Sequence, residues 1–378
     1  MKDFTYIIGG DLIGVTKGNY LSAKHNNGIY TPVTVGLGRT SKAWEISKTN
    51  KLKKIGEDYP RVQYDNNEPY LLIEPQVTNL VHTHHTAPSR SGFDLEYITA
   101  SGPYNEDIPV TRCYNISTSN TRLRIVHFGT TTGFSQNTNY TVSFWVKLTS
   151  GPDIQINPRI GPERPNFYDI SVADGWVFIE DTINSGTSIV DFADTGFNLI
   201  NGDITSELLV TGMNLKQEDY PTSSIYNVGG STTRARDTST SSLNPVTQNL
   251  LGSTSGTIYA NYLSRGGLCG ILIEPNGANA IMLISSGEYT RVFLKQDSST
   301  VYNFIGGTTG FNKVVVSYDY DSFIITINGV VIVETTIGYS GSWANTFRIG
   351  NYEGMLKMKE VKLYNRKLSK EEAILLSS

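Results

Sequence analysis

The acidic residues that could perform acid–base chemistry are few in this sequence. A glycosidase needs two carboxylates facing each other across the sugar, roughly 5 to 9 Å apart. Asp319 and Asp321 are the closest pair at alternate positions, but they directly follow an apolar strand pattern and are typical of a solvated turn. Glu360 stands among lysines without a second acid at alternate spacing. We therefore expect no catalytic residues and no enzymatic activity, and a polysaccharide depolymerase with unrecognised acids remains the alternative.

Nucleophilic chemistry also lacks its usual sequence context. There is no Gly-x-Ser-x-Gly elbow, and neither Cys113 nor Cys269 has a histidine nearby in the sequence. The two cysteines lie far apart in the chain, in different expected modules, so we predict free, buried thiols rather than a disulfide. We expect no cofactor.

A histidine cluster, His82-Thr83-His84-His85, is the sharpest candidate for metal binding. In an extended strand His82 and His84 share one face, and three copies around a trimer axis would gather six imidazoles, which suit a transition metal. A solvated loop is the alternative, because the residues that follow are typical of a loop. Loops at Asp297 and Asp321 could serve calcium, although nothing in their spacing demands it.

Aromatic side chains near loops of the C-terminal part could bind a sugar. An aromatic face stacks on the apolar face of a pyranose while neighbouring polar groups take its hydroxyls. The candidates for glycan binding are Tyr318, Tyr320, Tyr339 and Trp343. Packing in the core or at its rim is the alternative for each of them. Trp145 follows Phe144 on a strand, so the two point to opposite faces, and we expect Trp145 in the core.

The elements that would position these residues are short strands. Hydrophobic residues make up 38% of the sequence and charged residues 17%, with 36 glycines, which favours strands and turns over long charged helices. Asn328-Gly329 separates two β-branched runs and predicts a tight hairpin. Ser369 three residues before Glu372 predicts a helix N-terminus. The sequence therefore predicts an all-β fold with one short C-terminal helix.

The distribution of these patterns predicts two antiparallel β-sandwich domains of the jelly-roll type after an extended N-terminal arm. The arm covers residues 1–59, which are rich in Gly, Lys, Asn and Thr. The first sandwich covers 60–226, a Ser/Thr/Gly-rich linker covers 227–256, and the second sandwich covers 257–378. Arms of this kind usually become ordered on a sister subunit or on a particle surface.

Charge and hydropathy exclude several classes of partner. The formal net charge is −4, and no basic stripe is visible that would track a phosphate backbone, so we expect no nucleic acid. No apolar run approaches the roughly 20 residues of a membrane span, and no signal peptide pattern is visible, so we expect no membrane insertion. A protein made in a reducing cytoplasm and released by lysis fits this combination.

Three stretches of the sequence carry a resemblance to a known family. They open the first expected sandwich, form one of its strands and end it. The stretches are Pro60-Arg61-Val62-Gln63-Tyr64-Asp65 with Leu71-Leu72-Ile73-Glu74-Pro75-Gln76-Val77-Thr78-Asn79-Leu80, then Tyr140 to Lys147, and finally Glu218 to Ile225 with Thr233-Arg234-Ala235-Arg236-Asp237. They resemble the "PRFDY … LLIEPQRTNL", "YTLSVYVK" and "PTSYIPT … TRAAD" landmarks of phage virion and tail-fibre-type proteins. Gly212 to Lys216 depart from the family's usual "GAQLE".

The second expected sandwich is similar to concanavalin-like or laminin-G-like jelly rolls, on residues 325–329, 347–350 and 361–369. Together the resemblances imply a structural component of a phage virion, a head- or tail-fibre subunit that is commonly a homotrimer. They also imply contacts with other virion proteins through the N-terminal arm, attachment to host-surface polysaccharide, and localisation in the virion. A capsid or tail decoration protein that binds no host ligand is a further alternative, since fold alone does not establish function.

Overall fold

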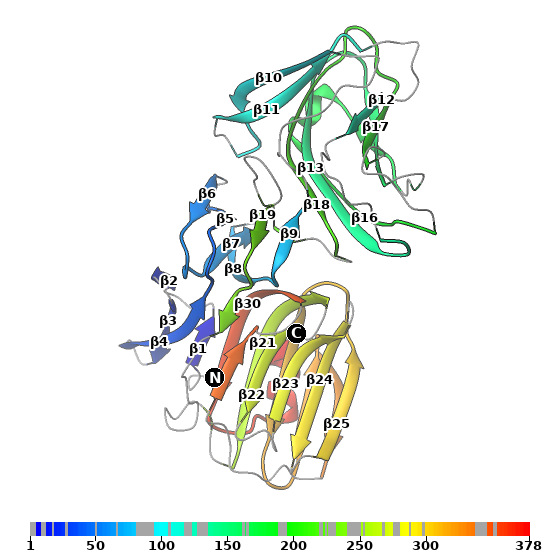
Figure 1. Ribbon diagram of the computed structural model, residues 1–378. Helices are drawn as coiled ribbons and strands as arrows, with labels where there is room; N and C mark the ends of the chain where they lie inside the picture. Colours follow the sequence, from blue (N-terminus) through cyan, green and yellow to red (C-terminus); the bar gives the residue numbers. More distant parts are fainter. Residues whose placement is uncertain are drawn as a thin grey trace. The chain divides into compact units, whose positions relative to one another are not determined.

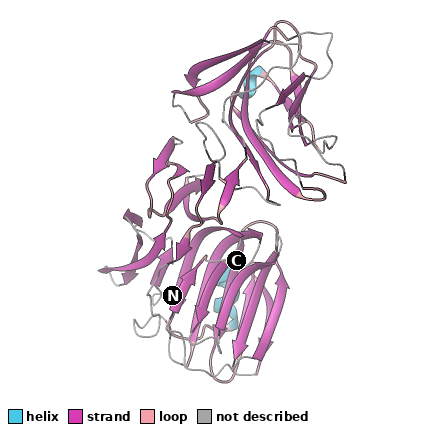
Figure 2. Cartoon of the chain, in the orientation of Figure 1, coloured by secondary structure: helices cyan, strands magenta, loops and turns pink. Residues whose placement is uncertain are grey.

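The computed structural model confirms the all-β prediction (Figure 2). The α-helix α1 (Lys370–Ser377) is the one α-helix in the described part of the chain. The structure describes residues 5–8, 13–16, 19–26, 29–49, 51–65, 67–80, 94–104, 107–116, 123–126, 135–160, 163, 166–187, 195–218, 222–223, 225, 232–239, 251, 254–266, 269–274, 280–286, 289–296, 299–336, 346–350 and 354–378. Within these ranges no helix is long and apolar enough to cross a membrane.

The chain forms two compact units, and the second is inserted into the first. Unit 1 consists of residues 1–48, 54–75 and 235–378, and unit 2 consists of residues 49–53 and 76–234. This division differs from the expected one, in which an arm, two sandwiches and a linker follow each other along the chain. Three segments that were expected outside the second sandwich account for the difference: residues 1–48, residues 54–75, and residues 235–256 of the expected linker.

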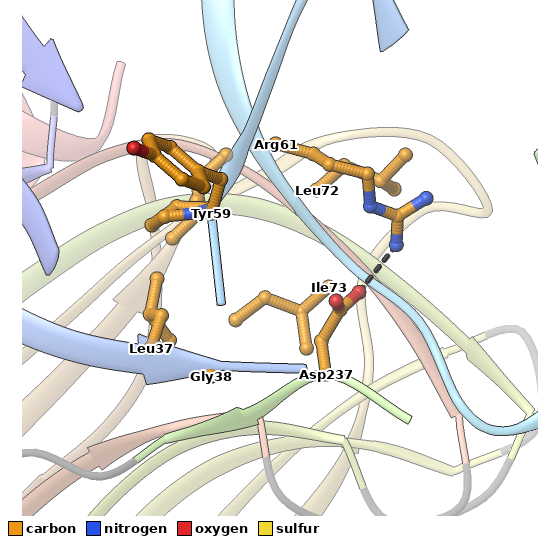
Figure 3. A pocket seen from close by; sticks show the side chains of 9 residues that line it. Leu37, Gly38, Tyr59, Arg61, Leu72, Ile73 and Asp237 are labelled. Carbon is orange, nitrogen blue, oxygen red and sulfur yellow. Dashed lines mark hydrogen bonds and ion pairs between the residues drawn. The ribbon is translucent and has the colours of Figure 1, made fainter. Parts of the chain in front are cut away.

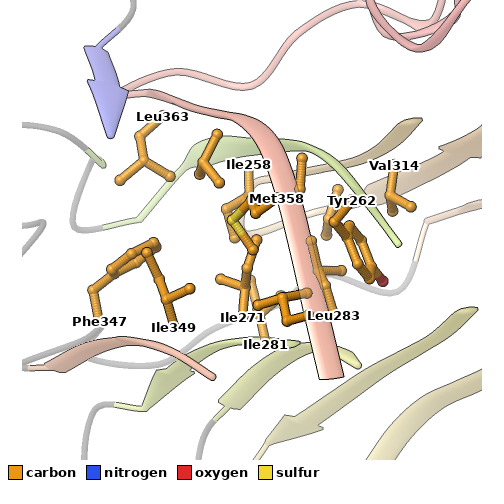
Figure 4. Close-up of a cluster of buried hydrophobic side chains, with 14 of the residues drawn as sticks. Ile258, Tyr262, Ile271, Ile281, Leu283, Val314, Phe347, Ile349, Met358 and Leu363 are labelled. Carbon is orange, nitrogen blue, oxygen red and sulfur yellow. The ribbon is translucent and has the colours of Figure 1, made fainter. Parts of the chain in front are cut away.

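Unit 1 is a sandwich of two antiparallel sheets (Figure 1). The larger sheet has the order β28 (Val330–Thr335), β27 (Phe323–Ile327), β26 (Asn312–Tyr318), β21 (Gly256–Gly266), β30 (Gly354–Tyr364), β8 (Glu68–Ile73) and β7 (Arg61–Asp65), with β1 (Thr5–Ile8) also paired to β30. The smaller sheet has the order β25 (Ser299–Gly306), β24 (Tyr289–Gln296), β23 (Ala280–Ser286), β22 (Gly270–Glu274) and β29 (Thr346–Ile349). Alternate apolar side chains of the two sheets meet in one core, where Ile258 and Met358 of the larger sheet join Ile271, Leu283 and Ile349 of the smaller one (Figure 4).

Residues 60–75 of the first landmark belong to unit 1, because β8 pairs with β30. Leu71 lies opposite Met358 and Ile73 lies opposite Leu356, and all four side chains are buried. The strands β7 and β8 form a hairpin at the edge of the larger sheet. The boundary expected at residue 60 therefore cuts through unit 1, because these strands complete a sheet through pairing with β30, which lies more than 280 positions later in the sequence.

The residues expected to form an extended arm also fold with unit 1. The strands β2 (Ile13–Thr16), β3 (Asn19–Asn26) and β4 (Ile29–Gly38) form an antiparallel sheet, and β5 (Ala43–Ile46) and β6 (Leu52–Ile55) form a pair. Val35 and Leu37 are buried in the core of unit 1. Short apolar runs among glycines predicted an extended arm. One of them, in β4, instead contributes core side chains to unit 1, because it packs against strands that are distant in the sequence.

Part of the expected linker is structured as well. The strand β19 (Thr232–Arg234) pairs with β9 (Val77–Asn79), and β20 (Thr238–Ser239) pairs with β4. Arg234 and Asp237 are buried, so their polar contacts order a stretch that has no aromatic residues. Residues 240–250 of the expected linker lie outside the described part of the chain.

Unit 2 is a second, smaller sandwich. Its five-stranded sheet has the order β10 (Asp94–Ser101), β11 (Asp107–Tyr114), β18 (Glu207–Lys216), β13 (Asn139–Ser150) and β16 (Val177–Asn184). Its four-stranded sheet has the order β12 (Leu123–Val126), β17 (Thr195–Ile200), β14 (Ile154–Ile160) and β15 (Tyr168–Ile170), and a short 3-10 helix, Val172–Asp174, precedes β16. Phe144 of β13 stacks on Phe197 of β17 with ring centroids 4.8 Å apart, and both are fully buried.

Two local predictions are confirmed in unit 1. The turn between β27 and β28 has Asn328 at φ 49° and Gly329 at φ 79°, the left-handed values that a two-residue hairpin needs. At the start of α1, the Ser369 hydroxyl accepts from the Glu372 amide at 3.2 Å while the Glu372 carboxylate accepts from the Ser369 amide at 2.9 Å. The helix packs Ala373 against the outward face of the larger sheet.

Both cysteines are free and buried, as predicted. Cys113 lies in the core of unit 2 and Cys269 in the core of unit 1. Burial raises the pKa of the Cys113 thiol, and it raises that of Cys269 to about 12. Both thiols are therefore protonated and unreactive at neutral pH.

Candidate functional site

Of the four aromatic residues predicted to bind a sugar, the structure describes Tyr318 and Tyr320. The prediction that Tyr318 binds a sugar is wrong, because its side chain is 1% exposed and belongs to the core of unit 1. A Cβ at Gly256, directly opposite on β21, would lie 2.6 Å from the Tyr318 hydroxyl oxygen, so the glycine makes room for this ring. Tyr320 is 55% exposed. Tyr339 and Trp343 lie outside the described residues.

The acids singled out in the sequence are engaged in local structure. Asp319 Oδ1 accepts from the backbone amides of Asp321 and Ser322, and its Oδ2 forms an ion pair with Lys367 at 3.0 Å. These contacts outweigh the effect of burial and lower the pKa of Asp319. Glu360 forms an ion pair with Lys362 at 2.8 Å. The interpretation of Asp319 and Asp321 as a turn is thus confirmed.

Of the metal candidates, the structure describes Asp321 alone. His82, His84 and Asp297 lie outside the described residues. In the described ranges, no group of three or more His, Cys, Asp or Glu side chains could hold a metal ion.

The landmark residues instead meet in a buried ion network in unit 1 (Figure 3). The Arg61 guanidinium bonds both Glu74 and Asp237, and Asp237 also pairs with Arg39 at 2.9 Å. The backbone adds two bonds, since the Glu74 amide donates to Asp237 Oδ2 at 2.9 Å and the Asp237 amide donates to the Glu74 carbonyl at 3.0 Å. The ends of the two segments that lead into and out of unit 2 are thereby tied together.

The electrostatics of this network are those of a structural element. Burial alone lowers the pKa of Arg61, but the carboxylates of Asp237 and Glu74 outweigh it and the net shift is upward. For Arg39 burial dominates and its pKa is lowered, with Asp237 offsetting part of the effect. The hollow next to Asp237, with Tyr59 and Leu37 in its walls, has a cavity volume of about 10 Å³. It is far smaller than the roughly 300 Å³ at which ligand pockets begin.

The remaining landmark residues hold the end of β18 in unit 2. Asn79 donates to the carbonyl oxygens of Met213 and Ile225 and accepts from the Leu215 amide, so it satisfies three backbone groups. Lys216 Nζ bonds Thr222 Oγ1 at 2.8 Å as well as the carbonyl oxygen of the same residue. Lys216 lies in the stretch that departs from the family's landmark, and a buried ammonium anchors the following segment here.

An aromatic patch on the outward face of the five-stranded sheet of unit 2 is the best candidate for a binding surface. We define it as Tyr104, Trp145, Trp176 and Phe178. The Trp145 ring lies 5.3 Å from Tyr104 in an edge-on arrangement and 4.9 Å from Phe178 in a tilted one. Phe178 is 39% exposed, and Trp176 Nε1 donates to the Ser101 carbonyl at 3.1 Å. Burial raises the pKa of Tyr104 to about 12, so its hydroxyl stays neutral.

Charged side chains lie on the same face beside the aromatic patch. Trp145 of β13 lies opposite Thr211 of β18. Two residues further along the same face, Leu209 of β18 lies between Lys147 of β13 and Arg112 of β11. Arg112 is held by Glu207 at 2.6 Å and by Glu96 at 3.0 Å, with side chains that are all partly exposed. Its hydrogen bonds to these two carboxylates raise the pKa of Arg112, and the same pairing lowers that of Glu207.

Rings with neighbouring planar polar groups can bind a saccharide: the rings cover apolar C–H surface and the charged groups bond hydroxyls. The aromatic patch was not predicted from the sequence, because the buried face of β13 was assigned wrongly. Trp145 was expected in the core, but Phe144 is the core residue and Trp145 faces outward. Alternation along β13 shows that the two rings point apart, yet it does not show which face is buried. Phe178, next to buried Ile179, could have been found by the same alternation in β16.

The chain matches no protein-family model and none of the curated proteins. Among solved structures, domain 4 of the extracellular GH43 arabinanase AbnA from Geobacillus stearothermophilus, solved with arabinotriose, aligns at 13% identity with a TM-score of 0.29 over 42% of this chain and 84% of that domain. A sialidase from Trypanosoma rangeli aligns at 11% identity with a TM-score of 0.26 over 96% of this chain and 69% of the sialidase. Similarity this low carries no argument about topology or activity.

Proposed function

We propose that this chain is a structural and adhesive subunit of a phage particle, part of a head or tail fibre, which attaches the particle to host-surface glycans without cleaving them. The aromatic patch of unit 2 carries the proposal for glycan binding. The virion assignment, including localisation in the particle, is supported by the resemblance of the landmark residues to phage virion and tail-fibre-type proteins.

The composition of the aromatic patch suits a neutral sugar ring. Trp145 of β13 and Phe178 of the edge strand β16 offer apolar ring surface, and a polysaccharide has access to it from the side of β16. The fixed Arg112 with its two carboxylates offers both donors and acceptors, which is what adjacent hydroxyls of a pyranose require. Neither Tyr104 nor Arg112 changes its charge near neutral pH, so we expect binding that is insensitive to pH between about 6 and 8.

Attachment without cleavage is favoured over depolymerase activity by the state of the candidate acids. Asp319 caps a turn and is paired with Lys367, and Glu360 is paired with Lys362. A glycosidase acid needs a raised pKa to remain protonated. The pKa of Asp319 is shifted in the opposite direction.

Assembly into a homotrimer and contacts with other virion proteins are further parts of the proposal. The N-terminal residues were expected to dock on such partners, and residues 1–48 belong to unit 1. A partner would therefore contact a folded sandwich. Measurement of the mass in solution tests the trimer directly, and a monomer at micromolar concentration would contradict it.

A glycan array combined with a reducing-sugar release assay tests the function. We expect the full chain to bind at least one neutral or weakly charged glycan and to release no reducing ends. Phe178→Ala removes an exposed ring from the aromatic patch and should weaken binding about tenfold, since one ring contact contributes roughly 1 to 2 kcal/mol. Phe167→Ala, which removes an exposed phenylalanine next to β15 in the other sheet of unit 2, is the matched control and should bind as the parent does.

Two outcomes would decide against the proposal. Release of reducing sugar from a bound polysaccharide would identify a depolymerase. Absence of binding to any glycan, with the protein still present on purified particles, would favour a passive decoration protein.

A further inference from the structure

The charged side chains beside the aromatic patch of unit 2 are unequally divided between the two signs. The guanidinium of Arg112 on β11 is shared by two carboxylates, those of Glu96 on β10 and Glu207 on β18. The side chains of Glu96 and Glu207 are 47% and 27% exposed, so water and ligands reach both of them. One positive charge therefore meets two negative charges, and this ion group has a surplus of one carboxylate.

Two further acids lie on the same outward face. Glu180 follows Phe178 by two residues on β16, and Asp94 precedes Glu96 by two residues on β10. Residues two positions apart on a strand share a face, so each acid points to the side of its neighbour. Acids consequently flank the aromatic patch at both edges of the five-stranded sheet, β16 and β10.

Basic groups on this face do not balance these acids. Lys147 of β13 lies two strands away from Arg112, which corresponds to about 10 Å. Lys216 and Arg234 both bond Ser223 further along the face, but they are only 1% and 2% exposed. Among the described strand residues of this face that water reaches, four acids therefore stand against two bases.

The aromatic rings favour a positive charge as well. The quadrupole of a ring attracts a cation to the ring face, and recognition of ammonium groups in proteins uses this effect. The face already contains one such contact, because the Arg112 guanidinium carbon lies 5.0 Å from the ring centroid of Tyr114. The Phe178 ring, 39% exposed, offers a second face to a ligand.

We propose that the aromatic patch binds a glycan whose sugar rings carry free amino groups. The rings of the patch cover the C–H surface of the sugar, and the surplus carboxylates attract its ammonium groups. The same charges repel an acidic polysaccharide. The inference rests on the proposed function, and it names the substrate class for that same site.

Binding of a glucosamine hexamer to the full chain, compared with its N-acetylated counterpart, tests the inference. The two hexamers share one backbone and differ in the charge of the amino group. At about pH 5.5 the amines are protonated while the carboxylates are ionised. We expect both hexamers to bind, the glucosamine hexamer about tenfold more tightly at roughly 50 mM salt, and we expect this preference to shrink at about 500 mM salt.

Two variants with opposite expected effects separate charge from structural damage. Glu96→Gln removes the surplus carboxylate and should lower the preference for the glucosamine hexamer about fivefold, whereas Lys147→Gln removes an opposing base and should raise it. Glu68→Gln, which removes an exposed glutamate of unit 1, is the matched control and should leave the preference unchanged. Phe178→Ala should weaken the binding of both hexamers.

Three results would overturn the inference: equal affinity for the two hexamers or no binding of either, a preference that neither Glu96→Gln nor Lys147→Gln changes, or a lysine hexamer that binds as tightly as the glucosamine hexamer. The last result would identify a basic peptide as the partner. The glycan array judges the proposed function separately. Array binding that Phe178→Ala abolishes, together with equal affinity for the two hexamers, would refute amine recognition and retain glycan attachment.

Discussion

Replacing Asp237 by Asn should destabilise unit 1 and leave the stability of unit 2 unchanged. The Asp237 carboxylate accepts from Arg39 at 2.9 Å and from the Glu74 amide at 2.9 Å, and it also bonds Arg61. Asparagine has nearly the same shape but no charge, and its amide NH₂ group turns one donor toward the donors around it. Two buried guanidinium groups are then left with one carboxylate, that of Glu74.

The magnitude follows from burial. The side chains of Arg61 and Glu74 are 0% exposed and that of Asp237 is 9% exposed, so little water is available to replace the lost charge. Removing one partner of a buried ion pair typically costs about 3 to 5 kcal/mol. We expect a loss in this range in the free energy of unfolding of unit 1. A second substitution, Arg39→Met, should restore about 1 kcal/mol or more, because it removes one of the uncompensated charges.

Urea unfolding combined with hydrogen exchange measures this effect by unit. Amides of β8 and β30 should lose protection in Asp237→Asn, whereas those of β13 and β18 in unit 2 should keep it. Lys370→Met, which breaks an exposed ion pair with Glu334, serves as the control and should cost less than about 1 kcal/mol. A loss below about 1 kcal/mol in Asp237→Asn, or equal loss of protection in both units, would refute the reasoning.

Three further predictions concern single features. Gly329→Ala should destabilise unit 1 by about 1 kcal/mol in urea unfolding, because φ is +79° at this turn; an unchanged midpoint would contradict it. By NMR titration the pKa of Glu372 should be about 2, since Arg366 and the start of α1 hold its carboxylate, and Arg366→Met should raise it. Because this pKa is depressed on folding, its contribution to stability is complete above roughly pH 4.3 and is lost as the pH falls toward 2. Cys113 and Cys269 should react with a thiol reagent only after unfolding, and rapid labelling of the native protein would disprove their burial.

Local features of the fold were predictable from the sequence because they depend on neighbouring residues. The turn at Asn328-Gly329 and the helix start at Ser369 are determined by backbone conformations and hydrogen bonds within a few positions. These signals required no knowledge of which strands pair.

The division into units was not predictable in this way, because it depends on pairing between distant strands. Nothing near Leu71 indicates that its partner is Met358. The interpretation of Tyr318 as a sugar-binding residue failed for a related reason. Three consecutive valines precede it in β26, a pattern that indicates a strand buried on both faces, and α1 covers the outward face there. The tyrosine at its end is consequently enclosed.

The insertion of unit 2 between Pro75 and Ala235 has a consequence for how this chain can change over time. Glu74 and Asp237 are hydrogen bonded to each other through their backbones, so the polypeptide leaves unit 1 and re-enters it at nearly the same point. A recombination event that exchanges everything between these two positions replaces one guest domain by another and preserves every strand of the host. The glycan specificity that we propose for the guest would then diversify while the host sandwich stays constant.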